Sequence, residues 1–489
     1  MRPAATNVLS AGAIPATIRP MDHAIGMHAT GSAQDLLAAL WRDAGGEDAA
    51  LARLTLAARE PTLPSVFRVE RLASVSTAAA GLAAAEYHRV RSGVAQDVHV
   101  DSRHAEIAFL SERYLRVGGE WADHKNPLWG YYRSRDARYV QLHTTFPHHL
   151  AGHLALLGCE HDQEQVTRAV AARDAQALED AMAARMLPGV MMRSRGEWLD
   201  SAQGRAVSAL PLLEIMRIGD APPLAIPAGE RPLSGIRVLD LTKVIAGPVC
   251  GRTLAEHGAD VLRVHAPRLP FVPRLVIDTG RGKRSCHLDL AQPSDRERFE
   301  QLLAGAHVMT QGYRPGAIAA HGYGPQQVAA ARPGIVYLSL CAWSHAGPWS
   351  QRRGFDSLVQ MASGIAHAGA QAVGREDPHP LPCQALDHGT GYLAAFGVLM
   401  ALARQSREGG SWHVRVSLAQ SAEWLHRMGA IAALDRDTPP PDAVADLMDA
   451  ADTPFGVTHF VRPVAQLAAT PGHWARGAVP LGHDPPEWL

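Results

Sequence analysis

Two aspartates in the second half of the chain stand beside glycines, where a carboxylate has room to reach a bound substrate. Asp356 ends the segment 353–356 (RGFD), and Asp387 lies in the segment 386–391 (LDHGTG), at the head of an Ala-rich helix expected from 390 to 404. An aspartate at the head of a helix is first of all a cap, which stabilises the helix by about 1 kcal/mol. A carboxylate can also act as a nucleophile and form a covalent intermediate. Position alone favours the cap, so the nucleophile hypothesis needs support from other motifs.

Three loops in the same half carry residue types that bind phosphate and adenine. The segment 244–248 (VIAGP) leads from an expected strand into a helix, whose free N–H groups attract anions. The segment 280–285 (GRGKRS) places three cations among glycines, which allow close backbone approach, and cations neutralise phosphate. The segment 311–316 (QGYRPG) adds a cation and Tyr313, a ring that can stack on adenine or pack as a core residue. Taken alone, each loop can also be an ordinary turn, and none is a dinucleotide fingerprint or a Walker loop.

Histidines and cysteines are the residues that would hold a metal, and their spacing does not favour one. The histidine-rich stretch from His143 to His153 contains an i, i+4 pair but no Glu or Cys at metal-ligand spacing. The five cysteines are scattered, odd in number and never in a C-x-x-C spacing. This pattern favours reduced thiols in a cytoplasmic protein over a disulfide framework or a zinc site. We expect no metal and no permanently bound cofactor.

The composition is that of a globular protein. The 489 residues are 47% apolar and 19% charged, with a formal net charge of -1, which suits two or three packed units. No stretch concentrates Lys and Arg as a nucleic-acid footprint does, and no segment approaches the roughly 20 apolar residues that cross a bilayer. The first 20 residues lack the apolar core of a signal peptide. We therefore expect a cytoplasmic protein that binds neither nucleic acid nor membrane.

The motifs of the second half must be positioned by an α/β unit. Short β-rich runs at 236–242, 260–265, 285–290, 307–311 and 335–340 alternate with helical runs at 251–257, at 294–303 and up to 330. Strands that alternate with helices predict right-handed crossovers and a parallel sheet that is covered on both faces. Ligands bind such a sheet beyond the carboxyl ends of its strands. The expected fold class is therefore α/β, with a Rossmann-like parallel sheet, flanking helices and a smaller α+β domain.

The two halves of the chain share an internal sequence repeat. A shift of 316 residues places the segment 78–100 on the segment 394–416, and each copy is an Ala-rich helix, a glycine turn and a short strand. In this register Arg71 stands opposite Asp387, so the first copy lacks the acid. The rest of the first half predicts helical patches at 35–41 and 49–58, a helix at 72–91, a strand at 97–100 and a hairpin at 129–143.

We divide the chain into six parts on these patterns. Residues 1–65 form an N-terminal helical segment, 66–125 a degenerate first-copy fragment of the large domain, and 126–221 the small α+β domain. Residues 222–231 form a Pro-rich linker, 232–430 the large Rossmann-like domain, and 431–489 a C-terminal tail that packs on it.

Taken together, the motifs resemble the family III CoA-transferases, the group that contains formyl-CoA transferase, carnitine CoA-transferase and α-methylacyl-CoA racemase. The resemblance covers about 232 to 425 in the family's order, through the segments 232–248, 254–261, 282–285, 288–290, 313–316, 354–356, 363–364, 387–397 and 414–418. Residues 66–215 resemble the family's later portion, since 130–140 (GYYRSRDARYV) is similar to the strand pair that opens its small domain. The tail at 470–482 resembles the family's C-terminus. The chain thus looks like a fused, trimmed duplicate.

The resemblance implies a CoA-transferase whose covalent carboxylate is Asp387. It also implies that CoA is contacted by Val244, Ala246, Arg268, Lys283, Arg284, Gly312 and Tyr313. Coenzyme A and acyl-CoA are then substrates, and the other reaction partner is a small carboxylic acid. Because family members form interlocked two-chain rings, we expect either a homodimer or a single-chain pseudo-dimer. Arg71 in place of the acid implies one working site per chain.

Several positions depart from the family pattern. The family often has Glu where His265 stands and a basic residue where Ala320 stands, and the glycine-rich loop of formyl-CoA transferase has no counterpart. Racemase members carry a His where Phe355 stands and use it with the acid to move a proton. Phe cannot move a proton, so CoA transfer is favoured over racemisation. Two alternatives stay open, an acyl-CoA isomerase or racemase-type enzyme of the same fold and a CoA-binding pseudoenzyme subunit.

Overall fold

The computed structural model describes residues 23–120, 128–432 and 436–489. Its largest feature is a sheet in the order β1-β8-β14-β13-β12-β9-β10-β11. The strands from β14 to β11 are parallel, and in chain order they have the 3-2-1-4-5-6 arrangement of a Rossmann sheet. They are β9 (Arg237–Asp240), β10 (Asp260–His265), β11 (Lys283–His287), β12 (Val308–Gln311), β13 (Val336–Cys341) and β14 (Ser411–Ser417). Two antiparallel strands, β8 (Leu213–Gly219) and β1 (His23–Ile25), extend the sheet beyond β14.

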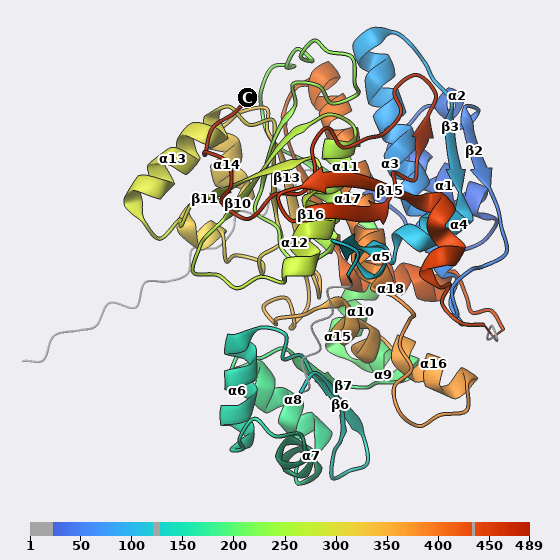
Figure 1. The fold of residues 1–489 in the computed structure, drawn as a ribbon, viewed down its shortest axis with the longest axis vertical. Helices are drawn as coiled ribbons and strands as arrows, with labels where there is room; N and C mark the ends of the chain where they lie inside the picture. The colour runs from blue at the N-terminus through green and yellow to red at the C-terminus, as the bar shows by residue number, and fades with distance from the viewer. Residues whose placement is uncertain (1–22, 121–127, 433–435) are drawn as a thin grey trace, which may run out of the picture.

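Helices cover both faces of this sheet because its strands alternate apolar side chains between two cores. Val238, Val261 and Val308 enter the larger core, and their neighbours Leu239, Leu262 and Met309 enter the smaller one. The smaller core is closed by α13 (Pro293–Ala304) and α14 (Pro325–Ala331), on the left in Figure 1. The larger core contains α11 (Ala246–Glu256), α17 (Ala385–Glu408) and α3 (Val69–Ser92). The expected α/β class with flanking helices is confirmed.

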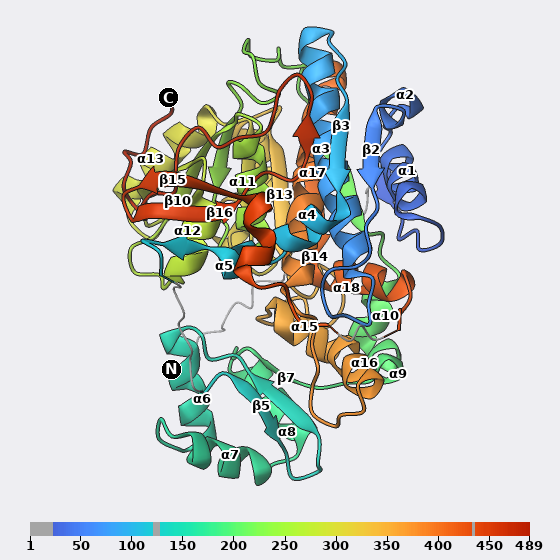
Figure 2. The same cartoon turned by 45° about the vertical axis from the view of Figure 1, so that its right-hand side comes forward.

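The smaller domain has its own sheet and its own core. Its antiparallel strands are β5 (Gly130–Arg133), β6 (Tyr139–Leu142) and β7 (Gly189–Met191), and its helices are α6 (Pro147–Leu157), α7 (Gln163–Ala171) and α8 (Ala175–Ala184). Figure 2 shows this domain below the large sheet, to which the chain returns through α9 (Arg195–Asp200), α10 (Ala202–Ser208) and β8. The predicted hairpin at 129–143 is confirmed by β5 and β6.

The two Ala-rich helices match each other in detail. Helices α3 and α17 have the same length and are offset by 316 residues, which is the offset of the internal sequence repeat. The residues that precede them, Arg68 and Gln384, have φ of -77° and -77° and ψ of 61° and 60°. The following helices, α4 (Ser102–Ala108) and α18 (Leu418–Arg427), begin at the same offset. Helices α3 and α17 pack side by side (Figures 1 and 2).

A small three-stranded sheet repeats one edge of the large sheet. Strand β3 (Val98–Asp101) pairs in parallel with β2 (Leu54–Ala57) and antiparallel with β17 (Gln466–Leu467), as β14 pairs with β13 and β8. The registers correspond: Val98 lies opposite Leu54 and Leu467, and Val414 lies opposite Leu338 and Ile215. Strand β8 therefore runs from the first half into the second half's sheet, and β17 runs from the second half into the first half's sheet.

One element prediction in the N-terminal segment is wrong. A helix was expected over 49–58, but α2 (Asp48–Leu51) is short and the chain then forms β2. The reason is tertiary: alternation in Leu54, Thr55 and Leu56 lets the strand pair with β3 and bury Leu56. The helix expected over 35–41 is present as α1 (Ala33–Asp43). The first 22 residues of the predicted 1–65 segment, and residues 121–127, lie outside the described residues.

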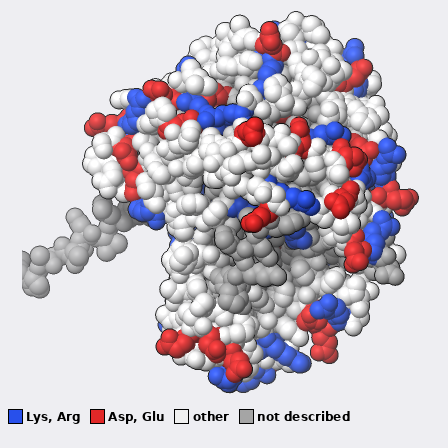
Figure 3. Space-filling model, viewed as in Figure 1, with Lys and Arg blue, Asp and Glu red and all other residues white. Residues whose placement is uncertain are grey.

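The remaining elements join the tail to the rest of the molecule. Strands β15 (Met448–Thr453) and β16 (Gly456–Val461) form a hairpin that pairs with β4 (Arg116–Val117), which follows α5 (Ser111–Tyr114). Helices α12 (Pro273–Gly280), α15 (Asp356–Ala362) and α16 (Ile365–Ala372) complete the large domain, with 3-10 turns at Ala319–His321 and Pro441–Leu447. Acidic and basic side chains are interspersed on the face in Figure 3. Within the described ranges, no helix combines the length and the apolarity that a membrane crossing requires.

Candidate active site

Two cavities meet at Asp387, at the carboxyl ends of the parallel strands. One, of about 890 Å³, lies between the small domain, α5, the start of α12 and the start of α15. The other, of about 370 Å³, is formed by the loops that follow β9, β12 and β13. Asp387, Phe355, Val244 and Phe146 line both cavities. A ligand in either cavity can therefore reach the same carboxylate.

Asp387 does not cap its helix. It lies in the first turn of α17. The N-cap residue of that helix is Gln384, whose side chain makes no capping hydrogen bond. The carboxylate of Asp356 instead accepts the backbone N–H of Asp387 at 2.9 Å and also accepts the side-chain amide of Gln360. Asp356 thus satisfies a free donor of α17 from outside the helix, and the Asp387 carboxyl, 7% exposed, lines the cavities.

Three buried carboxyl groups gather around this point. Burial, and then the charges of Asp356 and Glu112, raise the pKa of Asp387 well above its usual value. Burial also raises the pKa of Asp356 to about 6. Burial acts against ionised Glu112 as well, but His388, whose Nε2 lies 3.0 Å from the carboxylate, outweighs it and lowers the pKa of Glu112. Asp387 and Asp356 therefore hold protons more tightly than free aspartates, whereas Glu112 stays ionised.

The backbone around Val244 shapes the wall between the two cavities. Val244 has a φ of 70°, in the left-handed region that β-branched residues rarely adopt. The turn brings Val244 to the cavity and starts α11 at Ala246, so that the first residues of α11, Ala246 and Gly247, line the 370 Å³ cavity. Helices α11 and α17 approach so closely here that a Cβ on Gly391 would lie 2.5 Å from the carbonyl oxygen of Ala246. Four of the predicted CoA contacts, Val244, Ala246, Gly312 and Tyr313, line this cavity.

The structure does not bring two of the predicted cations to the cavities. Lys283 is 1% exposed, and its Nζ donates to Asp240 and to the carbonyl of Pro248, both at 2.8 Å. Arg284 pairs with Asp260 at 3.0 Å and donates to the carbonyl of Glu487 at 2.6 Å. The sequence shows cations among glycines, but it does not show that the carboxylates of Asp240 and Asp260 and the backbone carbonyl of Glu487 pair with them.

Arg268 lies beside a third cavity, of about 180 Å³, which Tyr313 also lines. Its guanidinium pairs with Asp289, with Nε at 2.6 Å from Oδ2. Tyr313 lines both this cavity and the 370 Å³ cavity, so the two adjoin at this residue. A planar group in the third cavity would therefore lie next to an aromatic side chain and a cation.

Three cations line the 370 Å³ cavity: Lys243, Arg314 and Arg353. Arg314 is the cation of the 311–316 loop, whereas sequence reasoning did not select Lys243 or Arg353. Lys243 directly precedes Val244, and its amine has no hydrogen-bond or ion-pair partner among the residues described. Burial, and then the charge of Arg268, lower the pKa of Lys243 to about 8. Arg353 Nη1 lies 2.6 Å from Nε2 of His149 and 3.1 Å from Nε2 of His148. The position of Lys243, after a strand at the sheet's carboxyl edge, is the signal that could have identified it.

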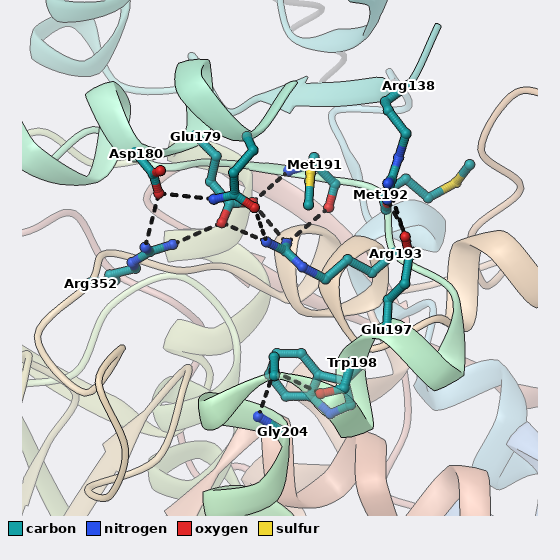
Figure 4. A network of polar contacts seen from close by, with 12 residues as sticks. Arg138, Glu179, Asp180, Met191, Met192, Arg193, Glu197, Trp198, Gly204 and Arg352 are labelled. Atoms are coloured by element: carbon teal, nitrogen blue, oxygen red, sulfur yellow. Dashed lines mark hydrogen bonds and ion pairs between the residues drawn. The ribbon is translucent and has the colours of Figure 1, made fainter. Parts of the chain in front are cut away.

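The loop that leads to Arg353 is held to the small domain by a buried ion-pair network (Figure 4). Glu179 of α8 is fully buried and accepts from Arg193 at 2.8 Å and from Arg352 at 3.1 Å. Both guanidinium groups also lie over the ring of Trp349, at 5.0 and 4.1 Å from its centre. Burial acts to raise the pKa of Glu179, but the bond from Arg193 outweighs it and lowers the pKa. The network therefore fixes one wall of the site.

Comparison with known proteins finds one family. The model of CoA-transferase family III matches residues 233–485. The acetyl-coenzyme A transferase nodX of Hypoxylon pulicicidum is 32% identical over 49% of this chain and 42% of its own length. The probable fatty acyl-CoA transferase Rv3272 of Mycobacterium tuberculosis is 31% identical over 43% and 57%, and human succinyl-CoA:glutarate CoA-transferase is 32% identical over 35% and 41%. The chain spans about half the length of the curated relatives that it matches.

A crystal structure of Rv3272 from M. tuberculosis has 29% sequence identity to the chain. It covers 41% of this chain and 58% of its own, with a TM-score of 0.36. In the described part of the chain, no group of three or more His, Cys, Asp or Glu residues is placed to hold a metal ion.

Proposed function

The chain belongs to CoA-transferase family III, and we propose that it moves CoA from an acyl-CoA donor to a carboxylic acid acceptor through Asp387. The observation that carries the proposal is the position of Asp387, whose buried carboxyl lies where two cavities meet. One cavity has the backbone donors, cations and aromatic ring that suit CoA, and the other has room for an acid. Both substrates can thus reach one nucleophile without exchanging places.

The proposed reaction uses the carboxylate of Asp387 as a covalent carrier. One of its oxygens bonds to the thioester carbonyl carbon of the donor, the C–S bond breaks, and CoA leaves as the thiolate. The thiolate then attacks the aspartyl carbonyl of this mixed anhydride, which releases the donor acid and leaves an aspartyl-CoA thioester. The acceptor carboxylate enters by the same two steps in reverse order, and the final attack by thiolate frees Asp387. Each step exchanges one oxygen or sulfur for another at an acyl carbon and needs no proton.

We place CoA in the 370 Å³ cavity. The N-terminus of α11 and the free amine of Lys243 suit its pyrophosphate, because both present positive charge to the same space. Tyr313 and Arg268 suit the adenine, in the adjoining 180 Å³ cavity. Val244, Ala246 and Gly312 remain proposed contacts. Lys283 and Arg284 are left out of the proposed contacts, because neither lines these two cavities and both pair with carboxylates.

We place the acyl group and the acceptor acid in the 890 Å³ cavity. Its apolar wall includes Trp129, Phe271 and Phe355, and its cations are Arg113 and Arg274. Arg274 has no ion-pair partner among the described residues, so a second carboxylate on the substrate would find a free guanidinium. This supports acids that carry two carboxylates, the kind named for the human relative, a succinyl-CoA:glutarate CoA-transferase.

We also propose that the chain is a fused and trimmed duplicate with one working site. The matched bounds of α3 and α17 and the matched registers of β3 and β14 support this proposal. In the first copy, Arg71 stands in the place of Asp387 and donates to the carbonyl of Gly31 at 2.9 Å. A guanidinium cannot attack a thioester, so the first copy contributes walls and not a second nucleophile. A single chain is then a pseudo-dimer.

The test is to trap the covalent intermediate. Protein incubated with acetyl-CoA or succinyl-CoA and then with hydroxylamine should carry a hydroxamate on Asp387, detectable by peptide mass spectrometry. The Asp387→Asn variant should carry none. Failure of the wild-type protein to form the adduct with either donor would count against transfer. Exchange of the α-proton of the acyl group with solvent, without any adduct, would select the isomerase alternative instead.

A further inference from the structure

One imidazole from the small domain, that of His143, lines the 890 Å³ cavity together with Asp387. His143 follows β6, is 8% exposed, and lines the 890 Å³ cavity together with Asp387 and Phe355. It lies 244 positions before Asp387 in the chain, and no sequence motif connects the two. The chain folds so that the edge of the small sheet closes one side of the reaction cavity.

The ring of His143 is held in a fixed plane. It stacks on Phe355 with ring centres 3.7 Å apart and an angle of 2° between the planes. Phe355 directly precedes Asp356, whose carboxylate accepts the N–H of Asp387. Two residues before His143, on β6, the side-chain amide of Gln141 donates to Ser357 Oγ at 2.9 Å. The imidazole is therefore positioned by the same segment that positions the nucleophile.

The two ring nitrogens of His143 have different surroundings. Nδ1 is buried and has no hydrogen-bond partner within the described ranges. A buried N–H without an acceptor is rarer in proteins than a buried acceptor without a donor. The proton is therefore favoured on Nε2. Because Nδ1 is buried and His143 lines the 890 Å³ cavity, Nε2 is the ring nitrogen left to contact a ligand there. This tautomer presents a hydrogen-bond donor toward the place where the acyl group must lie.

His143 is a neutral donor rather than a base. Burial lowers its pKa to about 3; the backbone of His143 itself acts against this shift, and the charge of His153 adds a smaller lowering of the pKa. The ionisable groups that share its cavity are Arg113, Arg274, Glu112, Asp356 and Asp387. A neutral imidazole polarises a carbonyl without giving up its proton. Because it is uncharged, the imidazole does not itself form an ion pair with Asp387.

We propose that His143 is a catalytic residue that donates a hydrogen bond from Nε2 to the carbonyl oxygen of the acyl group during transfer. The inference rests on the proposed function. When a carboxylate oxygen of Asp387 bonds to the carbonyl carbon, the π electrons of the C=O bond move to its oxygen. The donor at Nε2 stabilises that oxyanion until the C–S bond breaks and the thiolate leaves with the electron pair. No proton is transferred, so the electron balance of the proposed steps is unchanged.

The test compares two substitutions that separate the donor from the ring. His143→Phe keeps a ring to stack on Phe355 and removes the N–H, whereas His143→Gln places an amide N–H near the position of Nε2. Loss of one oxyanion donor typically lowers kcat by roughly 10²–10³-fold, and we expect this loss for His143→Phe with a smaller change in KM. His143→Gln should recover part of the rate. Neither variant should change the shape of the pH profile between pH 5 and 9.

A spectroscopic measurement separates the donor's effect from turnover. In Asp387→Asn protein saturated with acetyl-CoA labelled with ¹³C at the carbonyl, the hydrogen bond should lower the infrared C=O stretching frequency. Adding His143→Phe should raise it toward the value of free acetyl-CoA.

The outcomes distinguish the inference from the proposal beneath it. If wild-type protein forms the Asp387 adduct and His143→Phe forms it at the same rate, the inference is overturned and the proposed function stands. If the wild-type protein forms no adduct, the proposed function fails and the inference fails with it. If kcat falls but the carbonyl frequency does not move, His143 is structural and the inference is overturned.

Discussion

At the residue scale, Asp387, the proposed nucleophile, has an unfavourable charge state. Its carboxyl is buried beside two others, so the ionised form that attacks is costly to make. A desolvated carboxylate is also more basic and more nucleophilic once it is formed. The site therefore trades stability for reactivity, as active sites commonly do.

Asp387→Asn should abolish transfer and stabilise the protein increasingly as pH rises. Because burial raises the folded-state pKa of Asp387, folded protein holds this proton after unfolded protein has released it. Stability then falls with pH between the unfolded value of about 3.9 and the raised value. Asn carries no proton to lose, so the difference in Tm between variant and wild type should be small near pH 4 and grow toward pH 8. Thermal unfolding across this range measures it.

The control for Asp387→Asn is Asp442→Asn, at an exposed aspartate. Its Tm should follow that of wild type at every pH. A Tm difference for Asp387→Asn that shrinks as pH rises would contradict the raised pKa.

Two lysines forty residues apart allow the CoA site to be tested by contrast. Lys243 lines the 370 Å³ cavity and has no partner in the described part of the chain, whereas Lys283 is buried against Asp240. A hydrogen bond to a charged group is worth about 1.5–3 kcal/mol, so Lys243→Met should weaken CoA binding by roughly 10- to 100-fold. In the wild type, affinity should decline above pH 8 as the amine of Lys243 loses its proton. Calorimetric titration with CoA measures both effects.

Lys283→Met should lower the folding stability and leave the affinity for CoA nearly unchanged. It strands a buried carboxylate, which costs about 3–5 kcal/mol of folding stability, while CoA affinity of the protein that stays folded changes little. If Lys283→Met weakened CoA binding and Lys243→Met did not, the original sequence-based assignment would be right and the placement of CoA wrong.

At the scale of elements, the ion-pair network of Glu179 links α8 to the loop before α15. Glu179→Gln keeps the shape but leaves Arg193 and Arg352 without their shared charge. Losing one partner of a buried pair costs about 3–5 kcal/mol, which urea unfolding at pH 7 measures. The folded pKa of Glu179 is lowered, so its stabilisation is complete above the unfolded value of about 4.3 and is lost as pH falls below it.

The difference in stability between Glu179→Gln and wild type should therefore narrow as pH falls below 4. Glu164→Gln is the matched control, since Glu164 forms an exposed i, i+4 pair with Arg168 on the neighbouring α7. Exposed pairs contribute about 0–1 kcal/mol. Equal effects of the two substitutions would show that the buried network does not hold the loop.

The pattern of apolar and polar residues along the sequence predicted the strands and helices whose formation depends mainly on neighbouring residues. The alternating β-rich and helical runs predicted β9 to β13, and β10 has the predicted bounds, because it is an apolar run bounded by turns. Strand β11 begins two residues before the predicted run 285–290 and ends three residues before its end, because its sequence is largely polar. The offset of 316 likewise anticipated α3 and α17. Strand β2 was missed because its four residues sit in Ala-rich sequence and become a strand only through pairing with β3. A window of ten residues does not contain the distant strand with which a segment pairs.

The candidate site likewise contains residues that the sequence could predict and residues that it could not. Val244, Ala246, Gly312 and Tyr313 follow strand ends, so the sheet alone brings them together. Lys283 and Arg284 have the right residue type, but their partners Asp240 and Asp260 are fixed by strand register. His143 and Arg113 reach the cavity from the first half of the chain, and only the docking of the small domain places them there.

At the scale of the whole molecule, the two halves are interlocked by strand exchange. Strand β8 precedes residues 222–231 and lies between β14 and β1 in the large sheet. Strand β17 follows the large domain and completes the small sheet beside β3. Each half therefore contains a strand that satisfies the backbone of the other, and an unpaired edge would be exposed if they separated.

This exchange predicts that cutting the connection should not release the halves. A specific protease site inserted between Ala228 and Glu230, at exposed residues after β8, breaks the chain without touching a strand. The two fragments should elute together in size-exclusion chromatography without denaturant, at the volume of the uncut parent, and separate only in denaturing gels. The cut protein should still form the Asp387 adduct, because α5, His143 and Asp387 stay in place. Fragments that elute apart would mean that the covalent linker, and not the exchange of β8 and β17, holds the reaction cavity together.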